Sequence, residues 1–167
     1  NLSLCWRASG SGKGKFITIW RQYGRLQVRS VAQAREKNVK DKVVLVTGGA
    51  KRIGVAICRW LHQRGARLVI HYRSSRAEGE RLQQELEQSR PSSVVLVQAD
   101  LLDMAQISAL IDEAIRQFGQ LDALVNNASS FFATPIGLCD EAAWQELIGS
   151  NLKAPLFLSQ AAAPFLR

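Results

Sequence analysis

The sequence has few cysteines, a single methionine and no long apolar run. Its three cysteines, Cys5, Cys58 and Cys139, lie far apart. Neither their odd number nor their spacing predicts a disulfide framework or a zinc site. No apolar stretch approaches the ~18 residues that cross a bilayer, so no membrane-spanning helix is expected. These absences favour a reduced, cytoplasmic protein without a metal site or a membrane partner.

The chain starts at Asn1, and its only methionine is Met104. We therefore expect a fragment, a processed product or a translated reading frame with an artificial boundary. The length of 167 residues suffices for a domain with a hydrophobic core.

Positive charge is concentrated near the N-terminus. The chain carries 22 Lys and Arg against 14 Asp and Glu, a net charge of +8. Nine of the basic residues and one of the acidic residues fall within residues 1–40, which leaves 13 of each in residues 41–167. A nucleic-acid-binding domain carries its positive charge on the folded face, so we expect no nucleic-acid partner. Residues 1–40 lack periodicity and predict a flexible basic extension; a transit peptide is the alternative.

From residue 41 onward, short apolar strands alternate with amphipathic helices. Runs rich in β-branched residues predict strands over residues 42–46, 67–72, 93–98 and 123–126. Apolar residues at helical spacing predict helices over residues 53–61, 75–88, 107–118 and most of 141–167, the last with an irregularity at Pro155. This alternation predicts an α/β fold, a Rossmann-type doubly wound parallel sheet in three layers, α/β/α.

A glycine-containing loop follows the first predicted strand and opens the first helix. Residues 47–54 read TGGAKRIG. In this context Gly48 allows a tight turn, and Gly54 allows the helix to pack closely on the strand. The free N–H groups at the helix start favour an anion, for which pyrophosphate is the natural ligand. An ordinary turn between strand and helix is the alternative.

This loop resembles the TGxxxGxG signature of the short-chain dehydrogenase/reductase family. Arg52 stands where the middle glycine usually is, a form typical of pteridine reductases, which are a branch of that family. The resemblance implies that Arg52, with Ile53 beside it, lies at the cofactor phosphates, and that Arg52 also reaches the pterin. A cation in the first turn of a helix is disfavoured by the helix dipole, so a bound anion explains Arg52 better than a solvated side chain does.

The end of the second predicted strand lacks the acid that NAD enzymes use. Residues 71–75 read HYRSS and offer no carboxylate to a ribose 2′-hydroxyl. Arginine and hydroxyl donors suit a 2′-phosphate, and the segment resembles the HxRS stretch of pteridine reductases. We therefore expect NADPH rather than NADH. The residues expected to bind it at this end are His71, Tyr72, Arg73, Ser74 and Ser75.

The third predicted strand ends at Asp100 and Leu101. By resemblance, Asp100 accepts a hydrogen bond from the adenine amino group and Leu101 lines the adenine pocket. The alternative for Asp100 is that it caps the helix that follows.

Residues 126–132 read NNASSFF and follow the fourth predicted strand. They resemble the NNAG motif of the family in its pteridine-reductase form. The resemblance implies that Asn127 supports the sheet and the cofactor, with Ala128 beside it. It also implies that Ser129 binds cofactor phosphate or pterin and that Phe131 stacks on the pterin ring. The alternative is that Phe131 and Phe132 anchor the loop in the core.

Asn151 matches the asparagine of the family's catalytic tetrad, which bends its helix and holds a water of the proton relay. The family's Tyr-x-x-x-Lys pair is absent, because Gln27 follows Tyr23 and Arg76 follows Tyr72 at that spacing. In the family this pair lies beyond the asparagine and supplies the acid. We therefore expect residues 41–167 to be an incomplete NADP-binding domain, truncated before this motif and inactive alone.

The resemblance implies an NADPH-dependent pteridine reductase that transfers hydride to a C=N bond of a dihydropterin or dihydrofolate. It also implies a homotetramer in which the helix with Asn151 packs on a partner. One alternative is another member of the family, such as a 3-oxoacyl-carrier-protein reductase. A second is a non-catalytic nucleotide-binding module whose basic tether gives salt-sensitive binding.

Overall fold

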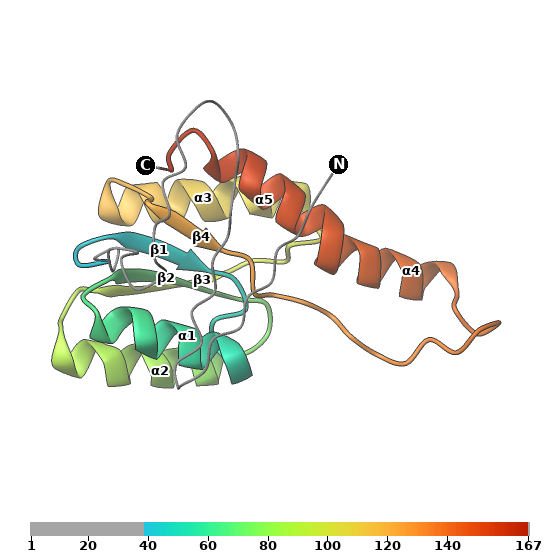
Figure 1. Ribbon diagram of the computed structural model, residues 1–167, viewed down its shortest axis with the longest axis horizontal. Coiled ribbons are helices and arrows are strands. Elements are labelled where there is room, and N and C mark those ends of the chain that lie inside the picture. The colour runs from blue at the N-terminus through green and yellow to red at the C-terminus, as the bar shows by residue number, and fades with distance from the viewer. Residues whose placement is uncertain (1–38, 167) are drawn as a thin grey trace, which may run out of the picture. The chain divides into compact units, whose positions relative to one another are not determined.

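Four parallel strands form the centre of the fold in the order β3-β2-β1-β4 (Figure 1). The computed structural model describes residues 39–166. The strands are β1 (Val43–Val46), β2 (Arg67–Tyr72), β3 (Val94–Gln98) and β4 (Ala123–Val125). All four lie where the sequence predicts them to within one residue: β1 and β3 begin one residue later, and β4 ends one residue earlier, than expected. The predicted basic extension lies outside the described residues, apart from residues 39 and 40.

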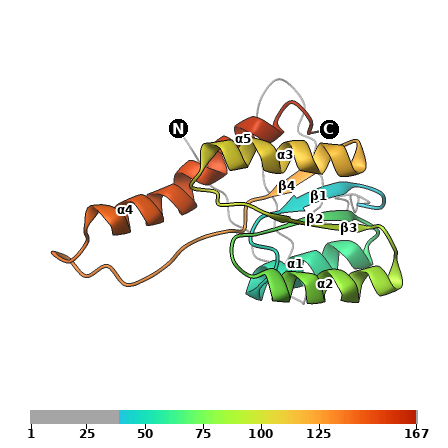
Figure 2. The same cartoon turned by 180° about the vertical axis from the view of Figure 1, so that it is seen from behind.

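Helices cover both faces of the sheet (Figures 1 and 2). They are α1 (Arg52–Gln63), α2 (Arg76–Ser89), α3 (Met104–Phe118), α4 (Glu141–Ile148), a π-helix η2 (Gly149–Lys153) and α5 (Ala154–Ala162). The α1 and α2 helices lie on one face, and α3 and α5 lie on the other, whereas α4 extends beyond the sheet. The predicted doubly wound, three-layer fold is therefore confirmed. None of the helices in residues 39–166 is long and apolar enough to cross a membrane.

Two hydrophobic clusters, one on each face, hold the layers together. Successive side chains of a strand point to opposite faces. Val43 and Leu45 accordingly join the cluster that contains the apolar residues of α3 and α5. Val44 and Val46 join the cluster that contains those of α1 and α2. Because both faces are covered, the strands are mostly apolar at consecutive rather than alternate positions, with the polar exceptions Arg67, His71 and Gln98 at or near strand ends.

The C-terminal helical region is interrupted one turn before Pro155, around Asn151, where the resemblance implies a bend. We expected the irregularity at Pro155, but the π-helix occupies the turn before it, and α5 ends at Ala162. Pro155 has no N–H to donate to the carbonyl four residues earlier, which belongs to Asn151. The preceding turn widens instead, as π-helical turns do. At its start, Gly149 is buried, and a Cβ there would lie 2.6 Å from Cδ2 of Leu102.

Candidate functional site

A cavity of about 380 Å³ opens where the loops leave the carboxyl ends of the four strands. In doubly wound sheets, ligands bind in this crevice, and the volume is in the range of small-molecule sites. The cavity brings together every residue predicted to bind the cofactor: Gly48, Arg52, Ile53, Gly54, His71, Tyr72, Arg73, Ser74, Ser75, Asp100, Leu101, Asn127, Ala128 and Ser129. Four residues that we did not predict also line it: Ala50, Lys51, Ser130 and Ser150.

The turn between β1 and α1 is too tight for side chains at two positions. Gly48 has a φ of 60°, in the left-handed region that favours glycine, and a Cβ there would lie 3.0 Å from Cα of Ala128. A Cβ on Gly54 would collide with the carbonyl oxygen of Gly48 and lie 2.7 Å from Cα of Gly49. Glycine at these two positions therefore allows the turn to pack closely against the loop after β4 and against the start of α1.

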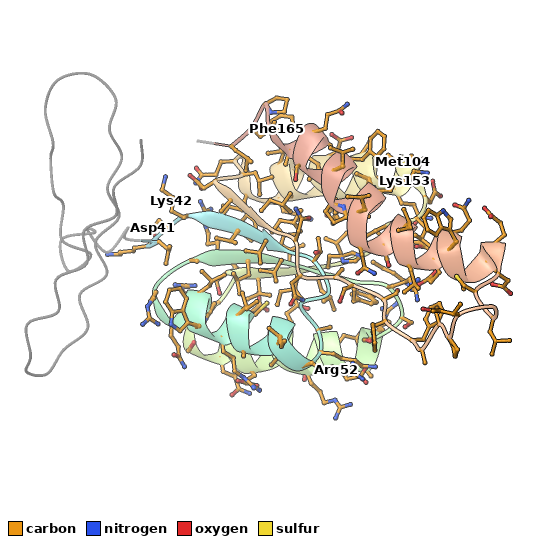
Figure 3. All side chains as sticks on the ribbon, turned by 45° about the vertical axis from the view of Figure 1, so that its right-hand side comes forward. Asp41, Lys42, Arg52, Met104, Lys153 and Phe165 are labelled. Atoms are coloured by element: carbon orange, nitrogen blue, oxygen red, sulfur yellow. The ribbon has the colours of Figure 1, made fainter. Side chains whose placement is uncertain are left out.

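Arg52 is the first residue of α1 and has a φ of 50°. This left-handed conformation is uncommon for a residue with a side chain and costs on the order of 1–3 kcal/mol. The side chain is exposed and extends away from the start of the helix (Figure 3). A charged side chain thus stands at the wall of the cavity, in a backbone conformation that suits glycine.

Hydrogen bonds tie the loop after β1 to the loop after β4. Asn127 donates from Nδ2 to the carbonyl oxygens of Thr47, at 2.8 Å, and Gly48, at 3.1 Å. The Thr47 hydroxyl oxygen accepts the backbone N–H groups of Asn127 and Ala128, both at 3.0 Å. Asn127 therefore supports the sheet edge, as the resemblance implies. We did not predict the role of Thr47; the signal for it was a hydroxyl between a buried strand and a glycine turn.

His71 is buried at the end of β2, with 2 % of its surface exposed. Its Nδ1 lies 3.1 Å from the Gly48 N–H and accepts from it, and its Nε2 lies 3.0 Å from the Ala99 carbonyl oxygen. A neutral ring with the proton on Nε2 satisfies both bonds. Burial lowers the pKa of His71 and outweighs the Ala99 bond and the charge of Asp100, which raise it. The side chain thus fastens the glycine turn to the ends of β2 and β3.

Arg73 follows β2 and forms an ion pair with a residue that the sequence did not indicate. Its Nη1 donates to Oε1 of Glu146 in α4 at 3.1 Å. The Ser130 hydroxyl donates to the same oxygen at 2.6 Å. The hydrogen bonds from Ser130, the larger effect, and from Arg73 both lower the pKa of Glu146. Together they outweigh partial burial, which raises it. No local pattern could have revealed Glu146, because Arg73 lies 73 positions away in the sequence.

Asn151 lies in the π-helix, within the predicted local bend. Its Nδ2 donates to the Ser130 carbonyl oxygen at 2.8 Å. Asn151 therefore contacts the loop after β4 but is not part of the cavity wall. Its predicted catalytic role stays a prediction.

Asp100 does not cap α3, so the alternative interpretation of this residue is wrong. The cap is Asp103, whose Oδ1 accepts the N–H of Ala105 at 2.9 Å. Asp100 lies one turn earlier, where its Oδ1 accepts the N–H of Leu102 at 3.0 Å. Asp100 also lines the cavity, and its predicted contact with adenine stays a prediction.

Phe131 and Phe132 do not anchor their loop in the core, so that alternative is also wrong. Their exposed fractions are 93 % and 41 %. The loop between β4 and α4 extends away from the sheet (Figures 1 and 2). Neither ring lines the cavity. Stacking of Phe131 on a ligand stays a prediction.

Residues 39–166 contain no group of three or more His, Cys, Asp or Glu that could hold a metal ion.

Comparisons with known proteins give consistent matches. The family described as short chain dehydrogenase matches residues 42–167. Pteridine reductase 1 of Leishmania tarentolae is 38 % identical over 152 residues, which cover 72 % of this chain and 53 % of that protein. An uncharacterized oxidoreductase of Methylorubrum extorquens is 33 % identical over 128 residues, covering 77 % of this chain and 51 % of that protein.

The fold also matches solved structures. A crystal structure of a blue fluorescent protein from a metagenomic library, in complex with NADPH, superposes with a TM-score of 0.74 at 37 % identity. The match covers 78 % of this chain and 53 % of that one. A Serratia marcescens short-chain dehydrogenase/reductase mutant has the same TM-score at 27 % identity and the same coverage. The chain thus spans about half the length of the proteins it matches.

Proposed function

The chain belongs to the short chain dehydrogenase family, a family of oxidoreductases, and on that premise we propose that the protein it comes from is an NADPH-dependent pteridine reductase. The observation that carries this proposal is Arg52, an arginine at the cavity wall with a φ of 50°. Glycine would adopt this conformation without strain. Strained backbone of this kind clusters at functional sites, and of the three residues other than glycine with positive φ in residues 39–166, Arg52 is the one that lines the cavity. The function proposed for Arg52 is to bind a cofactor phosphate and the substrate pterin.

The similarity to a curated pteridine reductase supports the substrate, and the similarity to an NADPH complex supports the cofactor. The cavity also fits NADPH by its own chemistry. The turn held open by Gly48 and Gly54 suits the pyrophosphate, since backbone donors can approach it closely. Arg73 and Ser74 suit a 2′-phosphate, because both can donate charge-assisted hydrogen bonds to it.

Five further residues of the cavity would hold the two ends of the cofactor. Asp100 and Leu101 are proposed for the adenine, and Asn127, Ala128 and Ser129 for the opposite end. When bound, NADPH supplies the hydride that reduces a C=N bond of a dihydropterin or dihydrofolate. Phe131 is proposed to stack on the flat ring, and such stacking contributes about 0.5–1.5 kcal/mol beyond burial.

The activity is proposed for the whole protein, since the chain spans about half the length of its relatives. Protonation of the reduced centre needs a general acid. The printed sequence offers no Tyr-x-x-x-Lys pair for this step. We therefore expect the 167-residue chain alone to lack pterin reductase activity, with Asn151 as the member of the catalytic set that it carries.

Two measurements test the proposal. Calorimetric titration of the chain should give tighter binding of NADPH than of NADH, and equal or reversed affinities would contradict the proposed cofactor. The complete protein should oxidise NADPH in the presence of dihydropterin or dihydrofolate but not with a 3-oxoacyl thioester. The reverse substrate preference would favour another branch of the family.

A homotetramer is proposed for the complete protein. Four apolar side chains at four-residue spacing lie exposed along α4, the π-helix and α5: Trp144, Ile148, Leu152 and Leu156. Such a stripe marks an unpartnered helix face. Light scattering of the complete protein should give a tetramer, and Leu152→Glu should reduce the assembly. A monomeric complete protein would contradict this.

A further inference from the structure

An ion pair joins two walls of the cavity. The β1 strand lies between β2 and β4. Arg73 follows β2, Ser130 follows β4, and both side chains donate to Oε1 of Glu146. Glu146 therefore connects the side of the cavity proposed to hold a 2′-phosphate with the side that leads to the proposed pterin site.

The pair is only partly shielded from solvent. The side chain of Arg73 is 53 % exposed and that of Glu146 is 27 % exposed. Within residues 39–166, Glu146 is the one hydrogen-bond partner of the Arg73 guanidinium, and it engages Nη1. A guanidinium has five N–H donors, so Arg73 can still receive an anion. The carboxylate, however, places a negative charge beside any anion that Arg73 binds.

The end of β2 has no acid of its own, and the fold supplies one from α4. Local sequence predicts an unopposed positive charge at residues 71–75. The tertiary structure instead pairs that charge with Glu146, whose pKa is lowered by its two donors, so that it is ionised at neutral pH. A 2′-phosphate would meet an arginine that is already partly neutralised, whereas the uncharged 2′-hydroxyl of NADH would meet little repulsion.

We propose that Glu146 is a specificity-determining residue that moderates the preference for NADPH over NADH by competing with the 2′-phosphate for Arg73. This inference rests on the proposed NADPH site. It concerns how strongly the site prefers NADPH over NADH. Without the Glu146 carboxylate, Arg73 would make that preference larger. Glu146 acts through Arg73, so its influence requires that arginine.

The test is calorimetric titration of the full chain and its Glu146→Gln variant with NADPH and with NADH at low ionic strength. Glutamine keeps a carbonyl oxygen that accepts from the Ser130 hydroxyl, so the variant removes the charge and preserves the loop contact. NADPH affinity should rise about two- to fivefold, the range of a partly exposed charge pair. NADH affinity should stay unchanged. The gain should shrink as salt is added, because salt screens exposed charges.

Two further variants test whether Glu146 affects NADPH binding through Arg73. Glu141→Gln makes the same charge change on the same helix, where Glu141 bonds Gln145 rather than an arginine, and it should leave both affinities unchanged. In an Arg73→Gln background, adding Glu146→Gln should no longer raise NADPH affinity. A gain that survives in that background would overturn the inference.

The other outcomes are equally decisive. Equal changes for NADPH and NADH would mean that Glu146 acts on the fold rather than on the phosphate. A loss of NADPH affinity in Glu146→Gln would mean that the carboxylate positions Arg73 for the phosphate, and either result overturns the competition. If the unmodified chain shows no preference for NADPH, the proposed cofactor itself is wrong and the inference fails with it. A preference for NADPH that Glu146→Gln does not alter overturns the inference alone.

Discussion

His71 should be a strong stabilising residue of this fold, because it satisfies two backbone groups at once. Replacing it with leucine removes the acceptor of the Gly48 N–H and the donor to the Ala99 carbonyl. A buried polar group left without a partner costs about 1–3 kcal/mol. The Gly48 bond is only partly buried, whereas the Ala99 bond is buried. We therefore expect His71→Leu to lower the free energy of unfolding by about 2–4 kcal/mol.

Urea unfolding of the chain, followed by far-ultraviolet circular dichroism, measures this loss. Two variants divide it between the bonds. The oxygen of an asparagine is attached at the same carbon as Nδ1 of histidine, so His71→Asn should keep the Gly48 bond. The amide nitrogen of a glutamine corresponds to Nε2, so His71→Gln should keep the Ala99 bond. Both variants should be more stable than His71→Leu. The reasoning is refuted if His71→Leu unfolds within about 0.5 kcal/mol of the unmodified chain, the range of a neutral surface substitution.

The same residue predicts a pH dependence. Because burial lowers the pKa of His71 in the folded state, the unfolded chain takes up the proton more readily. The contribution of His71 to stability is therefore complete above its unfolded pKa of about 6.5 and falls as the pH drops towards the lowered folded value. His71→Leu should show a shallower loss over this range. His62, whose pKa is also lowered by burial, contributes equally to both proteins.

Substitutions at Arg52, at Gly54 and at the two aspartates before α3 give three more expected outcomes. Arg52→Gly should raise the free energy of unfolding by about 0.5–1 kcal/mol by relieving the left-handed φ, measured with urea, and should weaken NADPH binding by calorimetry; a loss of stability would contradict the strain. Gly54→Ala should abolish NADPH binding and destabilise the fold by roughly 2 kcal/mol or more, because the added Cβ collides with the Gly48 carbonyl; unchanged binding would be inconsistent with the close turn. Asp103→Ala should lower the melting temperature by roughly 2–6 °C through loss of the α3 cap, whereas Asp100→Ala should chiefly weaken NADPH binding; the opposite pattern would reverse the two assignments.

The strands and the glycine turn could be predicted because their signals are local. A β-branched run such as residues 42–46 is buried on both sides in a parallel sheet, whichever helices cover it. Gly119 could be predicted as the end of α3 for the same reason, since it adopts a φ of 73° and donates to the Ile115 carbonyl at 2.7 Å. These features depend on neighbouring residues in the sequence.

Other features could not be predicted, because they depend on residues that the fold brings together. A bend at Asn151 was implied by the resemblance, but its π-helical form and its start at Gly149 reflect Pro155 and the close packing of Gly149 on Leu102. The bonds of Thr47 join loops about 80 positions apart. The exposure of Phe131 also depended on how far its loop extends from the sheet.

The sequence by itself determined the class of fold, the order of strands and helices along the chain, and most of the residues that line the cavity. It could do so because periodicity, glycine positions and short motifs act over a few residues. Only the tertiary structure decided which groups pair: His71 with the glycine turn, and Arg73 with Glu146. Hydrogen bonds and ion pairs act over a few ångströms, so the surroundings of a charge are set by segments distant in sequence. The stretch that lacks an acid in the sequence therefore acquires one in the fold.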